Sequence, residues 1–177
     1  MSEVLPPHPM ISPDWVRMMA RYNAWQNASA LSAAATLDDA ARLAPRGAFF
    51  GSIMGTLSHL LWADGVWLSR FGVDTAPQGG IRDSAALYVD WSAYTALRAD
   101  TDTRLNDWAA ALAPDDLTGD LTWYSGAAGR EVSRARALIL THLFNHQTHH
   151  RGQVHAMLTA AGARPGDTDL FLMPAAD

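Results

Sequence analysis

Apolar side chains recur at helical spacing over four long segments of the chain, separated by stretches rich in Gly, Pro and Asp. The first predicted helix runs from about residue 12 to residue 37. Ser12, Pro13 and Asp14 are typical of a helix N-terminus, as capping residue, first-turn proline and acidic partner of the helix dipole. Residues 38–47 are predicted to form a loop. The apolar positions of the first helix are Trp15, Met18, Met19, Tyr22, Trp25 and Leu31.

The other three predicted helices span residues 52–70, 83–112 and 134–161. The helix over 52–70 is apolar nearly all round, which predicts that most of its sides are buried. The turn-rich stretch 72–80 makes the connection to the third helix longer than a tight antiparallel turn needs. In the third helix we expect these side chains to face inward: Leu87, Trp91, Tyr94, Leu97, Leu105, Trp108 and Leu112.

Residues 120–133 have the pattern of a β-hairpin, with alternation in LTWY followed by a Gly-Ala turn. After the last helix, a tail carries three apolar side chains that we expect to pack back onto the body: Leu170, Phe171 and Leu172. Four long helices and one small hairpin before the last of them predict an all-α four-helix bundle. We expect residues 1–177 to form a single domain.

Composition narrows the possible functions. The 13 Lys and Arg are scattered and the net charge is -5, so we expect no nucleic-acid partner. The chain has no cysteine, which excludes disulfides, thiolate metal ligands and a cysteine nucleophile. No apolar run approaches the ~20 residues that span a bilayer, and the first residues lack a signal-peptide pattern. We therefore expect no membrane partner and a cytoplasmic protein.

The concentrated chemistry lies in a histidine cluster near the end of the chain. His142, His146 and His150 are four residues apart and share one helix face with apolar side chains. His149 lies at the edge of this face, and His155 lies on the opposite side. Imidazoles packed in an apolar interior need a shared proton, a hydrogen-bond partner or a cation. A divalent metal ion is the simplest answer, although histidines with ordinary hydrogen bonds remain the alternative.

A metalloprotease motif is excluded, because Gln147 stands where H-E-x-x-H needs the glutamate after His146. A third metal ligand should come from another helix, and His59 is the best candidate. Small side chains surround it on its helix: Ser52, Gly55, Thr56 and Ala63. They leave room for a metal, but they equally fit a seam between packed helices. Asp64 is the carboxylate alternative, yet it lies ~140° around the helix from His59 and should not reach the same ion.

Four segments stand in an order that is typical of one family: RYNAWQN (21–27), FFGSIMGTLSHLLWADGVWLSRF (49–71), GRE (129–131) and HLFNHQTHHRGQVHAML (142–158). Through them the chain resembles the DinB-like (DNA-damage-inducible) family of metalloenzymes. The resemblance implies an up-down-down-up bundle that holds one divalent ion through His59, His146 and His150, with His150 favoured over His149. It also implies a homodimer.

Three neutral ligands would leave such an ion strongly Lewis acidic, which favours activation of water or of a small-molecule thiol. The sequence therefore predicts a metal-dependent hydrolase or a thiol-dependent S-transferase acting on a small-molecule substrate. His142 is the candidate for a base beside the ligands, with Glu131 and Asn145 as weaker ones, and Trp123 and Tyr124 are candidates for a pocket mouth. The alternative is a non-catalytic bundle that uses a metal or small ligand as a sensor or a structural element. Zinc, nickel, iron and manganese all fit a nitrogen-only ligand set.

Overall fold

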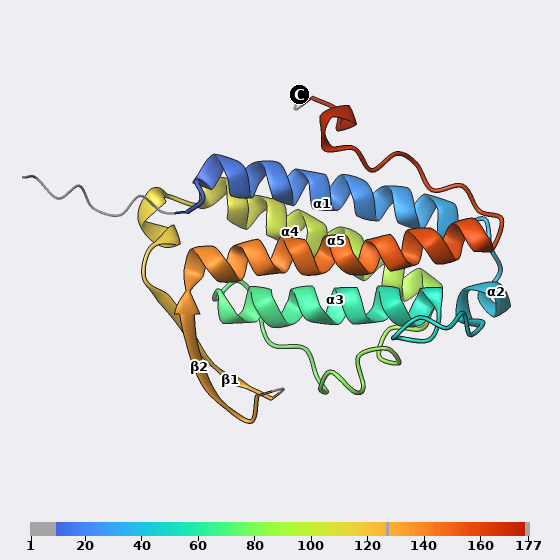
Figure 1. The fold of residues 1–177 in the computed structure, drawn as a ribbon, viewed down its shortest axis with the longest axis horizontal. Helices are drawn as coiled ribbons and strands as arrows, with labels where there is room; N and C mark the ends of the chain where they lie inside the picture. Colours follow the sequence, from blue (N-terminus) through green and yellow to red (C-terminus); the bar gives the residue numbers. More distant parts are fainter. Residues whose placement is uncertain (1–9, 127, 176–177) are drawn as a thin grey trace, which may run out of the picture.

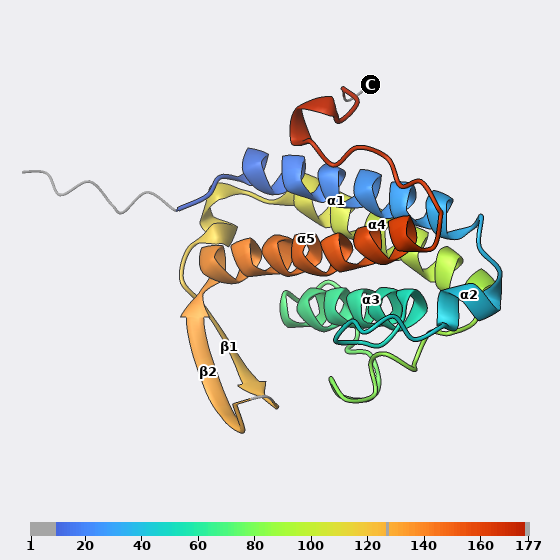
Figure 2. The same cartoon turned by 45° about the vertical axis from the view of Figure 1, so that its right-hand side comes forward.

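The protein is a bundle of four long helices in a computed structural model that describes residues 10–126 and 128–175 (Figure 1). The helices are α1 (Pro13–Ala34), α3 (Ile53–Arg70), α4 (Trp91–Ala111) and α5 (Arg136–Ala160). α1 and α5 run in one direction and α3 and α4 in the other, so the order is up-down-down-up (Figure 2). α1 packs against α4 and α5, and α3 packs against the same two helices. The predicted all-α bundle is confirmed, and none of the described helices is long and apolar enough to cross a membrane.

Side-chain caps mark the starts of α1, α3 and α4. The Ser12 hydroxyl accepts from the Trp15 amide at 3.1 Å, and the Ser52 hydroxyl accepts from the Gly55 amide at 2.9 Å. α1 and α3 therefore begin where the sequence predicts. α4 does not: it begins at Trp91 rather than at Asp83, because Asp90 caps it.

The residues before Asp90 form turns instead of helix. The Asp83 carboxylate accepts from the Gly80 amide at 2.9 Å, which holds residues 80–86 in a compact loop. Two of the side chains predicted to face inward are exposed, Leu87 at 38% and Leu97 at 41%. The wrong start of this helix has a simple cause: the apolar spacing of residues 83–90 continues that of the helix, but the capping Asp90 interrupts it. Leu97 lies within α4, at an exposed position.

α1 buries a different face from the one that its large side chains predicted. Its most buried positions are Val16, Ala20, Asn23, Gln26, Asn27, Ala30, Ala33 and Ala34. Most of these side chains are small, so α4 and α5 can approach closely, and the predicted bulky residues lie half-buried at the sides. α1 also ends at Ala34 rather than at residue 37. The predicted loop after it contains a short helix, α2 (Asp39–Leu43), which Asp38 caps.

The tail after α5 runs back along α1 (Figure 1). It is attached by polar contacts: the Tyr22 hydroxyl donates to the Thr168 carbonyl at 2.6 Å, and the Gln26 amide donates to the Asp167 carbonyl at 3.0 Å. The prediction that its apolar residues pack onto the body is wrong. They form a short 3₁₀ turn, η2 (Leu170–Leu172), in which Phe171 is 83% exposed.

The predicted hairpin is confirmed, with β1 (Asp120–Ser125) antiparallel to β2 (Arg130–Ala135). It follows a 3₁₀ turn, η1 (Pro114–Leu117), and leads directly into α5. The hairpin projects from one end of the bundle, on the side where the α3–α4 connection runs (Figure 1). Trp123 lies opposite Val132 in the ladder, and side chains alternate between the two faces along each strand.

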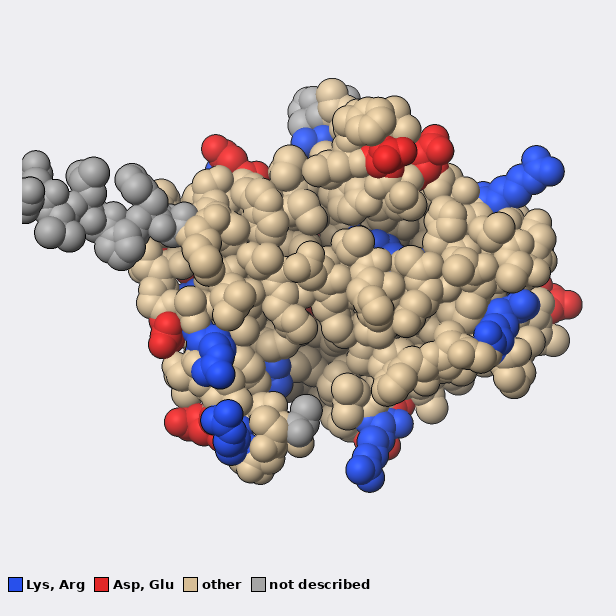
Figure 3. Space-filling model, in the orientation of Figure 1, with Lys and Arg blue, Asp and Glu red and all other residues tan. Residues whose placement is uncertain are grey.

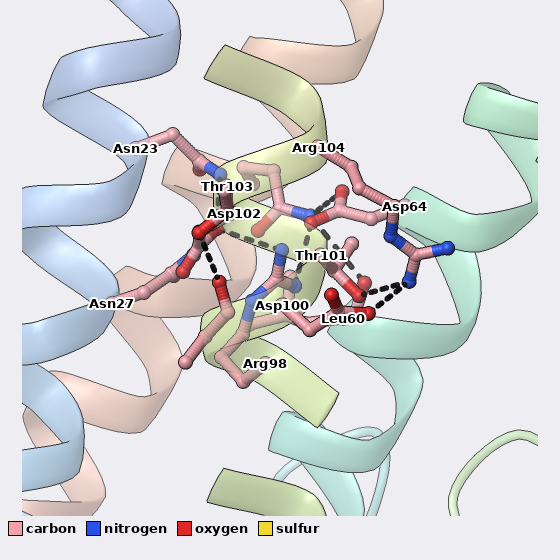
Figure 4. A network of polar contacts seen from close by, with 12 residues as sticks. Asn23, Asn27, Leu60, Asp64, Arg98, Asp100, Thr101, Asp102, Thr103 and Arg104 are labelled. Carbon is pink, nitrogen blue, oxygen red and sulfur yellow. Dashed lines mark hydrogen bonds and ion pairs between the residues drawn. The ribbon is translucent and has the colours of Figure 1, made fainter. Parts of the chain in front are cut away.

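The apolar core is divided into two clusters by a layer of polar side chains. This middle polar layer draws on all four long helices and consists of Asn23, Asn27, Asp64, Arg98, Asp102, Gln147 and Arg151. At its centre, the Arg98 guanidinium binds Asp64 and Asp102, each at 2.7 Å (Figure 4). Two arginines and two aspartates balance, so the layer carries no net charge.

Candidate metal centre

His59 from α3 and His146 and His150 from α5 meet at the interface of these two helices. One ring nitrogen of each lies within 4.8 Å of the others. His59 and His150 are buried and His146 is half-buried. We call these three residues the histidine trio, and it is the same set that the sequence predicted.

A serine from the α3–α4 connection determines the tautomer of His59. The Ser84 hydroxyl donates to the Ile81 carbonyl at 2.7 Å, so its oxygen is left to accept from His59 Nδ1 at 2.9 Å. The ring proton of His59 therefore lies on Nδ1, and the lone pair of Nε2 points toward the trio. A second contact holds this serine in place, because the Ser58 hydroxyl donates to the Ser84 carbonyl at 2.5 Å.

Gln153 determines the tautomer of His150 in the same way. The side-chain oxygen of Gln153 lies 2.8 Å from His150 Nδ1, which must donate to it, so Nε2 again keeps its lone pair. The amide nitrogen of Gln153 lies 3.3 Å from His149 Nε2. His149 is exposed and outside the trio, so the structure brings together His150 rather than its neighbour.

The spacing of the ring nitrogens fits a shared cation. His59 Nε2 and His146 Nε2 lie 3.2 Å apart. Two nitrogens at 2.0–2.1 Å from a tetrahedral ion are separated by roughly 3.3 Å. Because the His59 lone pair faces His146, a proton or a cation has to lie between the two rings to avoid repulsion.

Burial keeps these rings neutral. It lowers the pKa of His59 to about 4, with a further contribution from His150. It lowers the pKa of His146 to about 3, and the neighbouring histidines add to the effect. The carboxylate of Asp64 is turned away and bound to Arg98 and Gln147, as its position on the helix predicted. Each neutral ring keeps one unprotonated nitrogen, so the trio could bind a divalent metal ion.

A phenylalanine covers one side of the trio. The Phe50 ring stacks on His59 with 3.7 Å between centroids and 18° between planes. Gly55 permits this approach, because a Cβ there would lie 2.3 Å from the Phe50 carbonyl oxygen. Nothing in the helical spacing of α3 predicts this contact, since Phe50 precedes the helix.

On its other side the trio opens into a cavity of about 870 Å³. His59 and His146 are part of the lining, together with side chains from α3, the α3–α4 connection, the hairpin and the start of α5. The large apolar members of the wall are Trp62, Val66, Trp67, Ile81, Trp123, Val132 and Ile139. Figure 3 shows a hollow between the hairpin and the body of the bundle. A small molecule can therefore reach the trio from solvent.

A comparison with known protein families tests the family membership that the sequence motifs suggested. The model of the DinB family matches residues 10–176, nearly the whole chain. The chain belongs to the DinB family. A comparison with curated proteins finds no match.

The remaining candidates of this DinB-family protein divide between the cavity and the surface. His142 lines the cavity, with its ring 5.7 Å from that of His146 and 5.3 Å from that of Trp67. Its pKa is lowered by burial and by the nearby Arg70 charge. Trp123 also lines the cavity, whereas Tyr124 points to the other face of β1 and is exposed.

Glu131 and Asn145 are exposed and lie outside the cavity lining. His155 lies on the opposite side of α5, as predicted, where it lines a second cavity of about 480 Å³. Sequence reasoning missed Ser84 as a partner of the trio, because it placed this residue inside the third helix. It also missed that Gln153 orients the ring of His150.

Proposed function

We propose that this DinB-family protein is a metal-dependent enzyme whose ion is held by His59, His146 and His150. One observation carries the proposal: one ring nitrogen of each of the three histidines lies beside an open cavity, while Ser84 and Gln153 fix the tautomers of His59 and His150 from behind. A divalent ion held by three neutral imidazoles supplies Lewis acidity that activates water or a thiol. Zinc, nickel, iron and manganese are all compatible with the donor set.

The reaction that we propose is hydrolysis or thiol transfer on a small molecule. His142 faces the cavity one helical turn before His146, and its lowered pKa keeps it neutral near pH 7, so it is suited to accept a proton from the nucleophile. The apolar walls of the cavity suit a substrate with an apolar part. Because the chain has no cysteine, a thiol has to arrive with the substrate.

The test begins with metal content. We expect about one divalent ion per chain, lost in His146→Ala and retained in His149→Ala, the matched control one position outside the trio. Metal added at 100 times its dissociation constant should stabilise the native protein by about 2.7 kcal/mol and leave His146→Ala unchanged. Retention of the ion by His146→Ala, or its loss from His149→Ala, would contradict the assignment of the trio.

Activity is measured on the metal-loaded protein with panels of esters, amides and lactones, and separately with electrophiles plus low-molecular-weight thiols. Turnover in the first set indicates a hydrolase, and turnover in the second a transferase. In either case His146→Ala should abolish it. Silence in both panels with full metal content would favour the non-catalytic alternative, a sensor or a structural metal site.

A further inference from the structure

The cavity beside the trio has a charge opposite to that of the protein as a whole. The chain carries a net charge of -5, yet the described residues that line this cavity include Arg70 and Arg134 and no Asp or Glu. Figure 3 shows basic side chains at the edge of the hollow below the bundle. Arg134 is exposed at the hairpin, whereas Arg70 is half-buried at the end of α3.

Arg70 lies between two indole rings. Its guanidinium carbon is 4.4 Å from the centre of the Trp67 ring and 5.2 Å from that of Trp123. Trp67 and Trp123 also contact each other edge to face, with 5.5 Å between ring centroids. Aromatic rings at these positions stabilise the cation and restrict the orientation of its plane.

The charge of Arg70 is not neutralised by the protein. Among the described residues it makes no ion pair and no hydrogen bond, in contrast to Arg98, which binds two aspartates. Partial burial lowers the pKa of Arg70, although an arginine remains protonated at any physiological pH. A half-buried guanidinium whose N–H groups have no acceptor is a ready partner for a carboxylate or phosphate group, which it can bind through two parallel hydrogen bonds.

Arg70 and the trio lie at opposite ends of the same cavity. The Arg70 side chain folds back over Trp67, which lies eight residues after His59 and so roughly 12 Å further along α3. His142 lies between these ends, in contact with Trp67 on one side and His146 on the other. A ligand that touches Arg70 and reaches toward the trio therefore has to be an elongated small molecule.

We propose that the cavity binds an organic acid with an apolar body: its acidic group lies on Arg70, its body packs against Trp67 and Trp123, and its far end lies at the histidine trio. This names the substrate class of the site and rests on the proposed function for what happens at the far end. Arg134, at the exposed edge, adds positive potential that favours entry of anions.

The test measures binding to the metal-free protein, so it does not depend on activity. The probes are 3-(2-naphthyl)propanoate, the phosphonate of the same shape, and the neutral naphthyl propanamide, followed by tryptophan fluorescence and calorimetry. We expect the native protein to bind the acid roughly tenfold to hundredfold more tightly than the amide. Binding of the phosphonate in place of the carboxylate identifies which acidic group is preferred.

Two variants sharpen the result. Arg70→Met keeps the length of the side chain and removes its charge, so it should lose the preference for the acid while binding of the amide stays the same. Arg164→Met, an exposed arginine outside the cavity lining, should bind both probes as the native protein does. Should Arg70→Met not fold, the preference of the native protein for acid over amide decides.

An acid that binds no more tightly than its amide, including the case in which neither binds, overturns the proposal, as does unchanged acid binding by Arg70→Met. Either failure with metal content intact leaves the proposed function standing. If the protein binds the acid but shows no metal binding and no turnover, only the proposed function is contradicted.

Discussion

The middle polar layer and the histidine trio are two polar regions in the same apolar bundle, and they share two helices. Asp64 of the layer lies five residues after His59 on α3, and Gln147 follows His146 on α5. The layer consists of opposite charges and amides that bind one another. The trio consists of three side chains of one kind: His59 and His150 have hydrogen-bond partners behind their rings, and the only hydrogen-bond contact between the rings is that of His59 with His146.

The comparison shows which kind of buried polar cluster indicates a ligand site. In the layer, the guanidinium of Arg98 opposes the rise in the pKa of Asp64 that burial causes, so the two charges compensate each other within the chain. Of the layer's fully buried side-chain nitrogen and oxygen atoms, only the Nε of Arg98 lacks a hydrogen-bond partner among the described residues. In the trio, burial lowers the pKa values, which leaves neutral rings with one nitrogen of each close to the others. The charges of the layer are therefore paired within the chain, whereas the trio is a group that could bind a cation.

The largest effect is expected from breaking the layer. Arg98→Leu leaves Asp64 as a fully buried carboxylate without its cation, and this should lower the free energy of unfolding by about 3–5 kcal/mol. Urea denaturation of the metal-free protein measures the loss. Arg104→Leu is the control on the same helix, because Arg104 pairs with Asp74 and Asp100 at the partly exposed surface and should cost less than about 1 kcal/mol.

Comparable losses in the two variants would mean that burial does not strengthen the Arg98 pairs, and the contrast between layer and trio would lose its energetic basis.

A smaller effect is expected from loosening the trio without touching a ligand. Ser84→Ala removes the acceptor that holds the Nδ1 proton of His59, so metal affinity should fall roughly 10- to 100-fold. Competition with a chromophoric chelator measures it. Ser69→Ala is the control, since the Ser69 hydroxyl donates only to the Val66 carbonyl of its own helix. Unchanged affinity in Ser84→Ala would show that this hydrogen bond does not orient the ligand.

The sequence predicted the trio from local signals together with the resemblance to the DinB-like family. His146 and His150 are one helical turn apart, and His59 lies in an apolar helix whose cap, Ser52, is explicit in the sequence. The four long helices and the hairpin were predicted from local signals too. The start of α4 was not, because the apolar positions before Asp90 keep helical spacing while the chain forms turns.

The middle polar layer could not be predicted from the amino-acid sequence alone. Each of its members interrupts an apolar stripe on its own helix, but their pairing depends on which helices are neighbours. Asp64 illustrates this: its position excluded it from the trio, yet only the packing of α3 against α4 places Arg98 beside it.

The homodimer stays a prediction. The apolar helix α3, whose surface a dimer could bury, is largely buried within one chain. A mass near 19.2 kDa measured by light scattering would indicate a monomer.

The smallest effect that we expect is a dependence of stability on pH that comes from the trio. An ordinary histidine has a pKa of 6.5, whereas burial lowers that of His59 to about 4 and that of His146 to about 3 in the folded protein. Between pH 6.5 and pH 4 the unfolded chain therefore binds protons that the folded chain does not. The stability of the metal-free protein should be flat above about pH 7 and fall as the pH drops through this window. Screening by solvent in the cavity keeps the fall modest.

Urea denaturation of chelator-treated protein between pH 7 and pH 5 measures this slope. The double variant His59→Gln with His146→Gln keeps the middle polar layer intact, so the contribution of the layer to the slope is the same in both proteins. This variant should show a flatter dependence, because the two lowered pKa values are gone. Identical slopes would mean that the folded protein protonates these rings as readily as the unfolded chain does. The trio would then be a solvated histidine cluster rather than a set of neutral donors held ready for a metal ion.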